Sequence, residues 1–473
     1  MHVSGRGADG LYHPTTESQV VELICLAKMR SVKLRVRGAG HSTRDAILTS
    51  DPDSDISIAL DRMAGVAFDH AARQVTVQAG CTLTTLFRQL DARGWALPST
   101  AGITHQTVSG FLATGSSGGS VLHSIGAQVV GLRLVDGRGI VHEMRKDADP
   151  DNAFFAAGVS LGLLGVITAV TFQCVERFDI VGFETTSSYA ECEIDLFGDG
   201  TGARPGLEEF FRTREHSRLM WFPQPGVERI TVWQARRRTS ADGPYVCQPY
   251  HVFPLIAGSM RPAHVFLNVL LRTLDVINPP APKTRWGHVL RALVERSYPL
   301  LASGFLSTGT HHFQDTWLDG LPMDNQVDND LVPTEFTEMW FPLDKTREVM
   351  RELEAYYREG GYRHTGSFSC EIYSSPRSEF WLSPAFQQDV VKINLFWFAR
   401  NRGNPITDFF PGLWQRLEPH GYRMHWGKLL SGNVPYLRRQ YPRWDDFMTL
   451  RARMDPGQLF VSEYWRTQLE IAT

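Results

Sequence analysis

Three glycine-rich segments in the first third of the chain constrain the fold more than any other feature. They lie at residues 38–40, 110–119 and 162–165; the first follows a predicted strand and the third runs into one. Glycine lets the main chain approach a ligand closely, and its backbone N–H groups can point into one concavity. Three such segments can together enclose one long, flat, polar ligand. The sequence therefore favours a fold in which several loops wrap around a bound molecule.

The rest of the first third alternates helices and short strands. Residues 17–30 have the spacing of an amphipathic helix, and a second helix follows Cys81. A hairpin with Asp136-Gly137 as its turn joins VVGLRLV to IVHEM. The other predicted strands are KLRVRG, SDISIAL, RQVTVQAG and GVITAVTFQCV. This pattern predicts an α+β fold and lacks the regular strand–helix repeat of a doubly wound sheet.

The second half has a different composition. Eleven of the twelve tryptophans follow residue 200, and a helix-prone stretch covers roughly residues 250–305. Its longer predicted strands are RITVWQARRR, TEFTEMWFP and VVKINLFWFAR. Because 473 residues are too many for one compact core, we expect two domains with different tasks.

Charge and cysteine content exclude several classes of protein. The chain has 48 Lys and Arg against 51 Asp and Glu, which gives no electrostatic footprint for nucleic acid. No apolar stretch approaches the span of a bilayer, and the first residues contain no apolar signal core. The six cysteines lie far apart with no CxxC pair, so neither a disulfide framework nor a zinc site is indicated. We expect a cytoplasmic protein without a transmembrane segment, and peripheral attachment to a membrane stays open.

The first glycine segment can bind a pyrophosphate but matches neither common nucleotide motif. Two glycines directly after a strand let N–H groups converge on an anion. GxGxxG is absent, because Thr43 occupies the third glycine position, and no Gly-Lys-Ser/Thr follows. Taken alone, RGAGHS is equally well a simple turn at the end of a strand. The second and third glycine segments shift the balance toward a ligand site.

Together these segments resemble the FAD-binding domain of the vanillyl-alcohol oxidase superfamily. The resemblance rests on RGAGHS at 37–42, PSTAGITHQTVSGFLATGSSGGS at 98–120 and GLLGVIT at 162–168. His425-Trp426-Gly427-Lys428 is similar to the HWxK mark of its aldonolactone and alditol oxidase branch, and DPGQLF at 455–460 is similar to the closing segment. The resemblance implies a PCMH-type FAD-binding domain of two subdomains, covering residues 1–178 and completed by 413–473. It also implies a cap or substrate domain at 179–412, with a large antiparallel sheet flanked by helices.

The resemblance also implies how FAD is held. The histidine of the GHS loop attaches covalently to the flavin in this family, and His41 occupies that position. The alternative is a histidine that only hydrogen-bonds the loop. A second covalent bond needs a cysteine near His105, and none is present there. The remaining implied cofactor contacts are Val36, Arg37, Gly38, Ala39, Gly40, Ser42, Thr107, Gly110, Thr114, Gly115, Ser116, Ser117, Ile167 and His425.

Chemistry on the substrate must come from the second half. The family carries Glu-x-Arg shortly before a Leu-Ser-Pro segment; here Glu371 matches the glutamate, and Tyr373 replaces the arginine. Tyrosine neither polarises a sugar oxygen nor lowers the pKa of the glutamate as strongly as arginine would. Lys428 can supply positive charge beside the reduced flavin. Since His425 and Lys428 are three residues apart, one helical turn would let both face the ring.

Other polar residues are candidates for substrate contact. Strand alternation in TEFTEMWFP places Glu338 and Trp340 on one face, where they can bind a sugar-like ligand or form a rim. Lys392 and Asn394 alternate similarly and are weaker candidates. The histidines of the second half have no metal-ligand spacing, so we expect no metal site.

These residues predict an FAD-dependent oxidase of a CH–OH group on a sugar-derived substrate. The expected partners are a small alcohol or sugar lactone and molecular oxygen or another electron acceptor. Tyr373 keeps a second possibility open, an oxidase or dehydrogenase of a non-sugar alcohol or natural-product intermediate on the same scaffold. A flavin-binding protein without turnover is the third.

Overall fold

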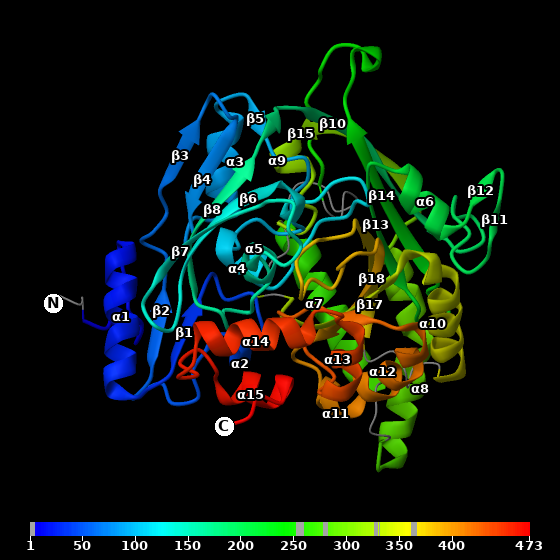
Figure 1. Cartoon of the computed structure of the whole chain (residues 1–473). Coiled ribbons are helices and arrows are strands. Elements are labelled where there is room, and N and C mark those ends of the chain that lie inside the picture. The colour runs from blue at the N-terminus through cyan, green and yellow to red at the C-terminus, as the bar shows by residue number, and fades with distance from the viewer. Residues whose placement is uncertain (1–4, 252–259, 278–281, 326–329, 331, 361–366) are drawn as a thin grey trace.

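Two sheets dominate the molecule, a five-stranded one in the N-terminal region and an eight-stranded one in the second half (Figure 1). The computed structural model describes residues 5–251, 260–277, 282–325, 330, 332–360 and 367–473. Helices cover the sheets and fill the lower edge of the view in Figure 1. The predicted α+β class is confirmed.

The five-stranded sheet has the order β3-β4-β8-β6-β7, and its pairs are antiparallel. The parallel pair β1–β2 and the short pair β5–β9 accompany it. Its region contains α1 Glu17–Arg30, β1 Leu34–Arg37, α2 Arg44–Ile47, β2 Ile56–Ala59, β3 Val66–Asp69, β4 Gln74–Gln78, α3 Leu83–Asp91, β5 Trp95–Ala96, α4 Val108–Ala113, β6 Val129–Val135, β7 Val141–Arg145, α5 Ala153–Ala157, β8 Val166–Gln173 and β9 Val175–Glu176. Both predicted helices and the predicted hairpin are confirmed.

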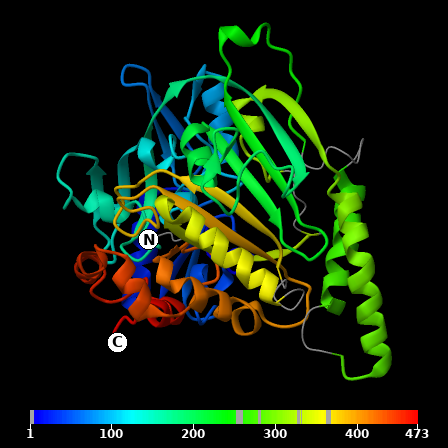
Figure 2. The ribbon, with the colours of Figure 1, turned by 90° about the vertical axis from the view of Figure 1, so that its right-hand side faces the viewer.

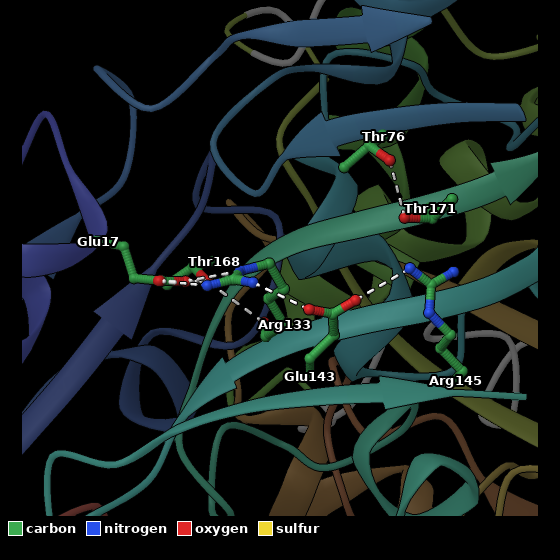
Figure 3. Close-up of polar contacts among 7 residues, drawn as sticks. All are labelled: Glu17, Thr76, Arg133, Glu143, Arg145, Thr168 and Thr171. Atoms are coloured by element: carbon green, nitrogen blue, oxygen red, sulfur yellow. Dashed lines mark hydrogen bonds and ion pairs between the residues drawn. The ribbon is translucent and has the colours of Figure 1, made fainter. Parts of the chain in front are cut away.

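Helix α1 is fixed to this sheet by charge as well as by its apolar face. Thr16 caps its first turn. Glu17 accepts hydrogen bonds from Arg133 Nη2 at 2.8 Å and from Thr168 Oγ1 at 2.6 Å (Figure 3). Arg133 also pairs with Glu143 on the neighbouring strand. These contacts hold the N-terminal helix against the strands that follow the glycine segments.

The eight-stranded sheet has the order β15-β10-β14-β13-β17-β18-β16-β19. The elements of this half are β10 Asp179–Ser188, β11 Gly200–Thr201, β12 Arg204–Pro205, α6 Leu207–Thr213, β13 His216–Phe222, β14 Arg229–Arg237, α7 Met260–Ile277, α8 Arg285–Phe305, β15 Gly309–Thr316, α9 Trp317–Gly320, β16 Thr334–Pro342, α10 Thr346–Gly360, β17 Ser367–Ser375, β18 Val390–Phe398, α11 Pro405–Asp408, α12 Phe410–Leu417, β19 Arg423–Met424, α13 Val434–Gln440, α14 Trp444–Met454 and α15 Glu463–Leu469. Among the described residues, no helix is both long and apolar enough to cross a membrane.

One sequence expectation is wrong in part. The sequence predicts a loop at the second glycine segment, residues 110–119, yet helix α4 covers its first residues. Thr107 caps α4 by accepting a hydrogen bond from the N–H of Gly110, and Phe111 and Leu112 are buried beneath it. A six-residue helix with a glycine in it is too short for its periodicity to stand out in the sequence.

The C-terminal residues return to the N-terminal region. The N–H of Leu34 donates to the carbonyl of Leu459 at 2.9 Å, and Trp465 Nε1 donates to the carbonyl of Ala46 at 2.9 Å. Figure 1 accordingly shows α15 beside α2. From the same segment, however, β19 pairs with β16 in the large sheet. The predicted boundaries, 1–178 with 413–473 and 179–412, stay a prediction.

Candidate active site

A cavity of about 560 Å³ lies between the glycine segments and one face of the eight-stranded sheet. All the predicted site residues line it except Arg37 and Gly115. Those that line it are Val36, Gly38, Ala39, Gly40, His41, Ser42, Thr107, Gly110, Thr114, Ser116, Ser117, Ile167, Glu338, Glu371, Tyr373, His425 and Lys428. The structure therefore brings together residues that lie hundreds of positions apart in the chain.

The wall formed by the glycine segments is main chain, and at several of its glycines neighbouring atoms leave no room for a Cβ. A Cβ at Gly38 would lie 2.2 Å from Thr107 Oγ1, and one at Gly118 would lie 2.1 Å from the carbonyl oxygen of Thr100. Gly40 has φ +87°, a conformation that other residues rarely adopt. Such a wall suits a pyrophosphate and a flat ring, because backbone groups can approach both without side chains intervening. The residues present fit FAD.

The first glycine segment contacts the HWGK motif, although the two lie near opposite ends of the sequence. The N–H of Thr43 donates to the carbonyl of Gly427 at 2.9 Å. A Cβ at Gly427 would lie 3.0 Å from Ser42 Oγ, so the two segments are in direct contact. Two of the motifs that carry the resemblance, RGAGHS and HWGK, thus form one continuous part of the cavity wall.

The expectation of a helical turn at His425 and Lys428 is wrong. The chain leaves β19 at Met424, and the N–H of Lys428 donates to the carbonyl of His425 at 3.1 Å in a tight turn. Both side chains still face the cavity. A spacing of three residues suits a four-residue turn as well as a helix, so spacing alone could not distinguish them.

His41 lies beside a second imidazole. Its ring centroid is 4.1 Å from that of His105, with the two rings edge to face. Burial, followed by the nearby charges of His105 and Lys428, lowers the pKa of His41 to about 4. The imidazole is therefore neutral at physiological pH, the form whose ring nitrogen can attack an electrophilic carbon.

His425 is fixed in position by hydrogen bonds at both ring nitrogens. Nδ1 accepts from the N–H of Gly427 at 3.0 Å, which leaves the proton on Nε2, 3.0 Å from Ser116 Oγ. Burial lowers the pKa of His425 to about 4. His425 therefore links the HWGK turn to the second glycine segment as a neutral donor.

The opposite wall is assembled by strand register. Glu371 on β17 lies opposite Met220 on β13 and Asn394 on β18, and Asn394 lies opposite Glu338 on β16. Residues directly opposite in an antiparallel pair point to the same face. One rung of four strands thus presents two carboxylates and an amide to the cavity.

Glu371 is held as a buried carboxyl group poised for proton transfer. Asn394 Nδ2 donates to its Oε2 at 3.0 Å, and Arg218 Nη1 lies 3.4 Å from its Oε1. Burial, followed by the nearby charge of Asp324, raises the pKa of Glu371 to about 7, although Arg218 acts in the opposite direction. A carboxyl group with a pKa near neutrality can accept a proton at physiological pH.

Glu338 and Tyr373 bond to each other rather than to Glu371. Tyr373 Oη donates to Glu338 Oε1 at 3.1 Å, and Trp340 Nε1 donates to the same oxygen at 2.7 Å. Glu338 is 2% exposed, so it is a buried carboxylate and not part of a rim. Burial also raises the pKa of Tyr373 well above its usual value. The pair forms a polar part of the cavity wall.

Arg218 is a site residue that sequence reasoning missed. It lies directly opposite Tyr373, in the rung next to that of Glu371, and it is buried. Its guanidinium pairs with Asp324 and with Glu371, and all three residues line the cavity. The charge absent at position 373 is thus supplied from the neighbouring strand. An arginine within the apolar strand HSRLMWF is the sequence signal that could have revealed it.

Lys392 joins the two walls. Its Nζ donates to the carbonyls of Ser117 at 3.0 Å and Gly118 at 2.8 Å, and it lies 3.6 Å from the ring centroid of Tyr373. Burial lowers the pKa of Lys392 to about 7. Lys392 holds the second glycine segment against the sheet, whereas its neighbour Asn394 lines the cavity.

Among the described residues outside the cavity, one group brings together atoms that can ligate a metal ion: His123, Glu215 and His216. The sequence predicts no metal site, and spacing could not have shown this group because His123 is 92 residues from Glu215. Glu215 already bonds to His123 at 3.1 Å and to Arg237 Nε at 3.0 Å. Burial raises the pKa of Glu215, but these contacts outweigh it and hold the pKa down at about 2, as in a partly buried ion-pair network.

Comparison with known proteins agrees with this geometry. A family profile described as FAD binding domain matches residues 8–145, and one described as D-arabinono-1,4-lactone oxidase matches residues 203–468. L-Gulonolactone oxidase of Mus musculus is 26% identical over 96% of this chain and 93% of its own length. L-Gulono-1,4-lactone dehydrogenase of Mycobacterium tuberculosis is 26% identical over 97% of this chain and 95% of its own. Alditol oxidase of a Streptomyces species is 24% identical over 98% of this chain and 96% of its own.

The solved structure of cholesterol oxidase from B. sterolicum superposes with a TM-score of 0.73, over 97% of this chain and 93% of that one. At 15% sequence identity, this likeness shows the fold alone. It confirms the predicted PCMH-type FAD fold with a large antiparallel sheet.

The fold, the glycine-lined wall and the FAD-binding profile define an FAD-dependent oxidoreductase. The D-arabinono-1,4-lactone oxidase profile covers more than half of the residues. The chain therefore belongs to the D-arabinono-1,4-lactone oxidase family, and the predicted resemblance is confirmed.

Proposed function

We propose that the protein oxidises a CH–OH group of a sugar-derived substrate, an aldonolactone, an alditol or a related polyol, with molecular oxygen as the final electron acceptor. Relatives aligned over nearly their whole length are named for gulonolactones and alditols, which supports this substrate class. Their names include both an oxidase and a dehydrogenase, so the test below compares oxygen with another electron acceptor.

The observation that carries the proposal is Glu371, a buried carboxyl group with a raised pKa that faces the FAD-binding wall. FAD, when bound, supplies the acceptor for the hydride of the alcohol carbon. Glu371 takes the hydroxyl proton, so that CH–OH becomes C=O with both hydrogens accounted for. The positive charge of Arg218 stabilises the ionised form of Glu371, and its guanidinium orients the carboxylate oxygens toward the substrate.

We further propose that His41 carries FAD through a covalent bond and that Lys428 supplies positive charge beside it. A neutral imidazole is the form that can make such a bond, and burial keeps His41 neutral. Lys428 is only partly buried, and its Nζ lies 4.0 Å from the ring centroid of Phe336. A cation there stabilises negative charge that develops within the cavity during oxidation.

A second candidate substrate is a non-sugar alcohol. Tyr373 binds Glu338, which leaves it less able to contact a sugar oxygen. The cavity is also lined by apolar residues, Met220, Phe222, Leu267, Phe305, Leu306 and Phe396. These walls suit a substrate with an apolar portion.

The test is anaerobic mixing of the purified yellow protein with aldonolactones, alditols and apolar alcohols while flavin absorbance is recorded. Bleaching by sugar-derived compounds is the expected result, and bleaching by apolar alcohols alone would favour the second candidate. No bleaching by any of them would mean a flavin-binding protein without turnover. Oxygen consumption compared with reduction of a dye then identifies the acceptor.

All six cysteines are free in the structure, and four of them are buried. This supports our proposal that the protein works in the reducing environment of the cytoplasm.

A further inference from the structure

Exposed apolar side chains are concentrated on one helical hairpin. Nine of the sixteen large apolar side chains exposed in the described residues lie between positions 265 and 301, on α7 and α8. Six of them form what we call the apolar face of the hairpin: Val269, Trp286, Val289, Leu290, Leu293 and Leu300. Soluble surfaces normally scatter such residues singly, so a continuous face indicates an interaction site.

Helical spacing places five of these residues along one side of α8. Trp286, Val289, Leu290, Leu293 and Leu300 follow each other at intervals of three, one, three and seven. Trp286 is 83% exposed, and the first buried side chain of α8 is Tyr298. Along the first three turns of α8, Val294 packs partly buried against core residues, whereas Trp286, Val289, Leu290 and Leu293 stay exposed.

The other side of the hairpin anchors it to the molecule. Leu271, Leu274 and Ile277 of α7 are fully buried in a separate core cluster with Tyr298 and Phe305 of α8. Figure 2 shows the hairpin along one edge of the molecule, with the lower end of α8 extending below the rest of the chain. The apolar face is thus presented on a firmly attached support.

The hairpin is basic although the chain as a whole is slightly acidic. Residues 260–305 contain six Lys and Arg against two Asp and Glu, whereas the chain has a net charge of −3. Both acidic residues are already paired, Glu295 with Arg291 and Asp275 with Arg402. Exposed positive charge therefore surrounds the apolar face, at Arg272, Lys283, Arg285 and Arg296.

We propose that this hairpin seats the protein on the surface of a bilayer that contains anionic lipids. An amphipathic helix with a tryptophan and flanking basic residues lies in the membrane interface, with its apolar face among the acyl chains. Anionic headgroups complement the arginines. A second copy of this chain fits less well, because symmetric pairing would set like charges against each other.

Residues of the hairpin and of the segment that follows it also line the candidate active site. Leu267 of α7, Phe305 at the end of α8 and the adjoining Leu306 line the cavity. The same hairpin that rests on the bilayer therefore forms part of the cavity wall, and docking holds the cavity beside the lipid.

The first test is flotation of the holoenzyme with vesicles of phosphatidylcholine alone, or with equal parts of phosphatidylcholine and phosphatidylglycerol. We expect flotation with the anionic vesicles and its loss at high salt. Trp286→Ser combined with Leu290→Ser should lower the partition coefficient about tenfold or more. Arg285→Gln combined with Arg296→Gln should lower it about tenfold on anionic vesicles. Met29→Ser, which removes a side chain 68% exposed on α1, is the matched control and should leave flotation unchanged.

The second test needs no variant. All twelve tryptophans lie in the described residues, and Trp286 is the exposed one among them. Brominated lipids in the anionic vesicles should therefore quench part of the fluorescence of the wild-type protein. Absence of both flotation and quenching would overturn the proposal. So would a dimer in solution that Trp286→Ser dissociates, because a second copy would then cover the face.

Discussion

The two walls of the cavity are built in opposite ways. The first is main chain from short continuous segments, in which Gly38 and Gly118 leave no room for a side chain. The second is a set of side chains from four strands, brought together by register between Arg218, Glu371 and their neighbours. The first wall should therefore be sensitive to any added atom and the second to any change of charge.

The largest effect should follow from adding one methyl group to the first wall. In Gly118→Ala the Cβ would lie 2.1 Å from a backbone oxygen, so the loop must move. We expect loss of most bound FAD and about 1–3 kcal/mol of stability, measured by the ratio of flavin to protein absorbance and by thermal unfolding. Gly202→Ala is the control, since nothing lies within 4 Å of its Cβ. Full FAD content in Gly118→Ala would show that the wall is not closed to side chains.

On the second wall, Glu371→Gln should slow anaerobic flavin bleaching about 100-fold or more while FAD stays bound. A carboxyl group must be deprotonated to act as a base, so the wild-type rate should rise with pH through a midpoint near 7. The variant should lose this dependence. Glu335→Gln, an exposed carboxylate on the same strand as Glu338, should change neither rate nor midpoint. A wild-type bleaching rate that stays constant between about pH 5 and pH 9 would contradict the role of Glu371 as the base.

Removing the positive charge of Arg218 should slow flavin bleaching less than Glu371→Gln does. It should also shift the pH dependence of the rate. Arg218 lowers the pKa of Glu371, so Arg218→Gln should move the midpoint of the pH–rate profile upward and slow bleaching about tenfold at neutral pH. Arg218→Lys should restore the midpoint but only part of the rate, because lysine lacks the planar fork. An unchanged midpoint in Arg218→Gln would mean that this residue only supports the fold.

The smallest effect should follow from removing the positive charge of Lys428. Lys428→Met should lower the flavin reduction potential and weaken sulfite binding several-fold, because negative charge on the bound flavin would lose its cation. Spectroscopic titration with sulfite measures this without any substrate. Unchanged sulfite affinity and potential together would show that Lys428 does not lie beside the flavin.

The difference between the walls also explains what could be predicted from the sequence. Each glycine segment is continuous, so RGAGHS and GLLGVIT identify the first wall directly. Strand alternation also places Glu371 and Tyr373 on one face correctly. The pairing of Arg218 with Tyr373 depends on register between strands about 150 residues apart, which local patterns do not encode. The turn at residues 425–428 was missed because a spacing of three suits both a turn and a helix.

The most direct test of the account is whether His41 carries FAD covalently. In the wild-type protein, flavin fluorescence should stay with the band on a denaturing gel, and mass spectrometry should show the mass of the chain plus FAD. His41→Ala should lose both signals while keeping yellow colour in the native state, since the glycine wall still binds the cofactor; His105→Ala is the matched control and should keep both. Wild-type protein that releases all of its FAD into an acid supernatant would contradict the account.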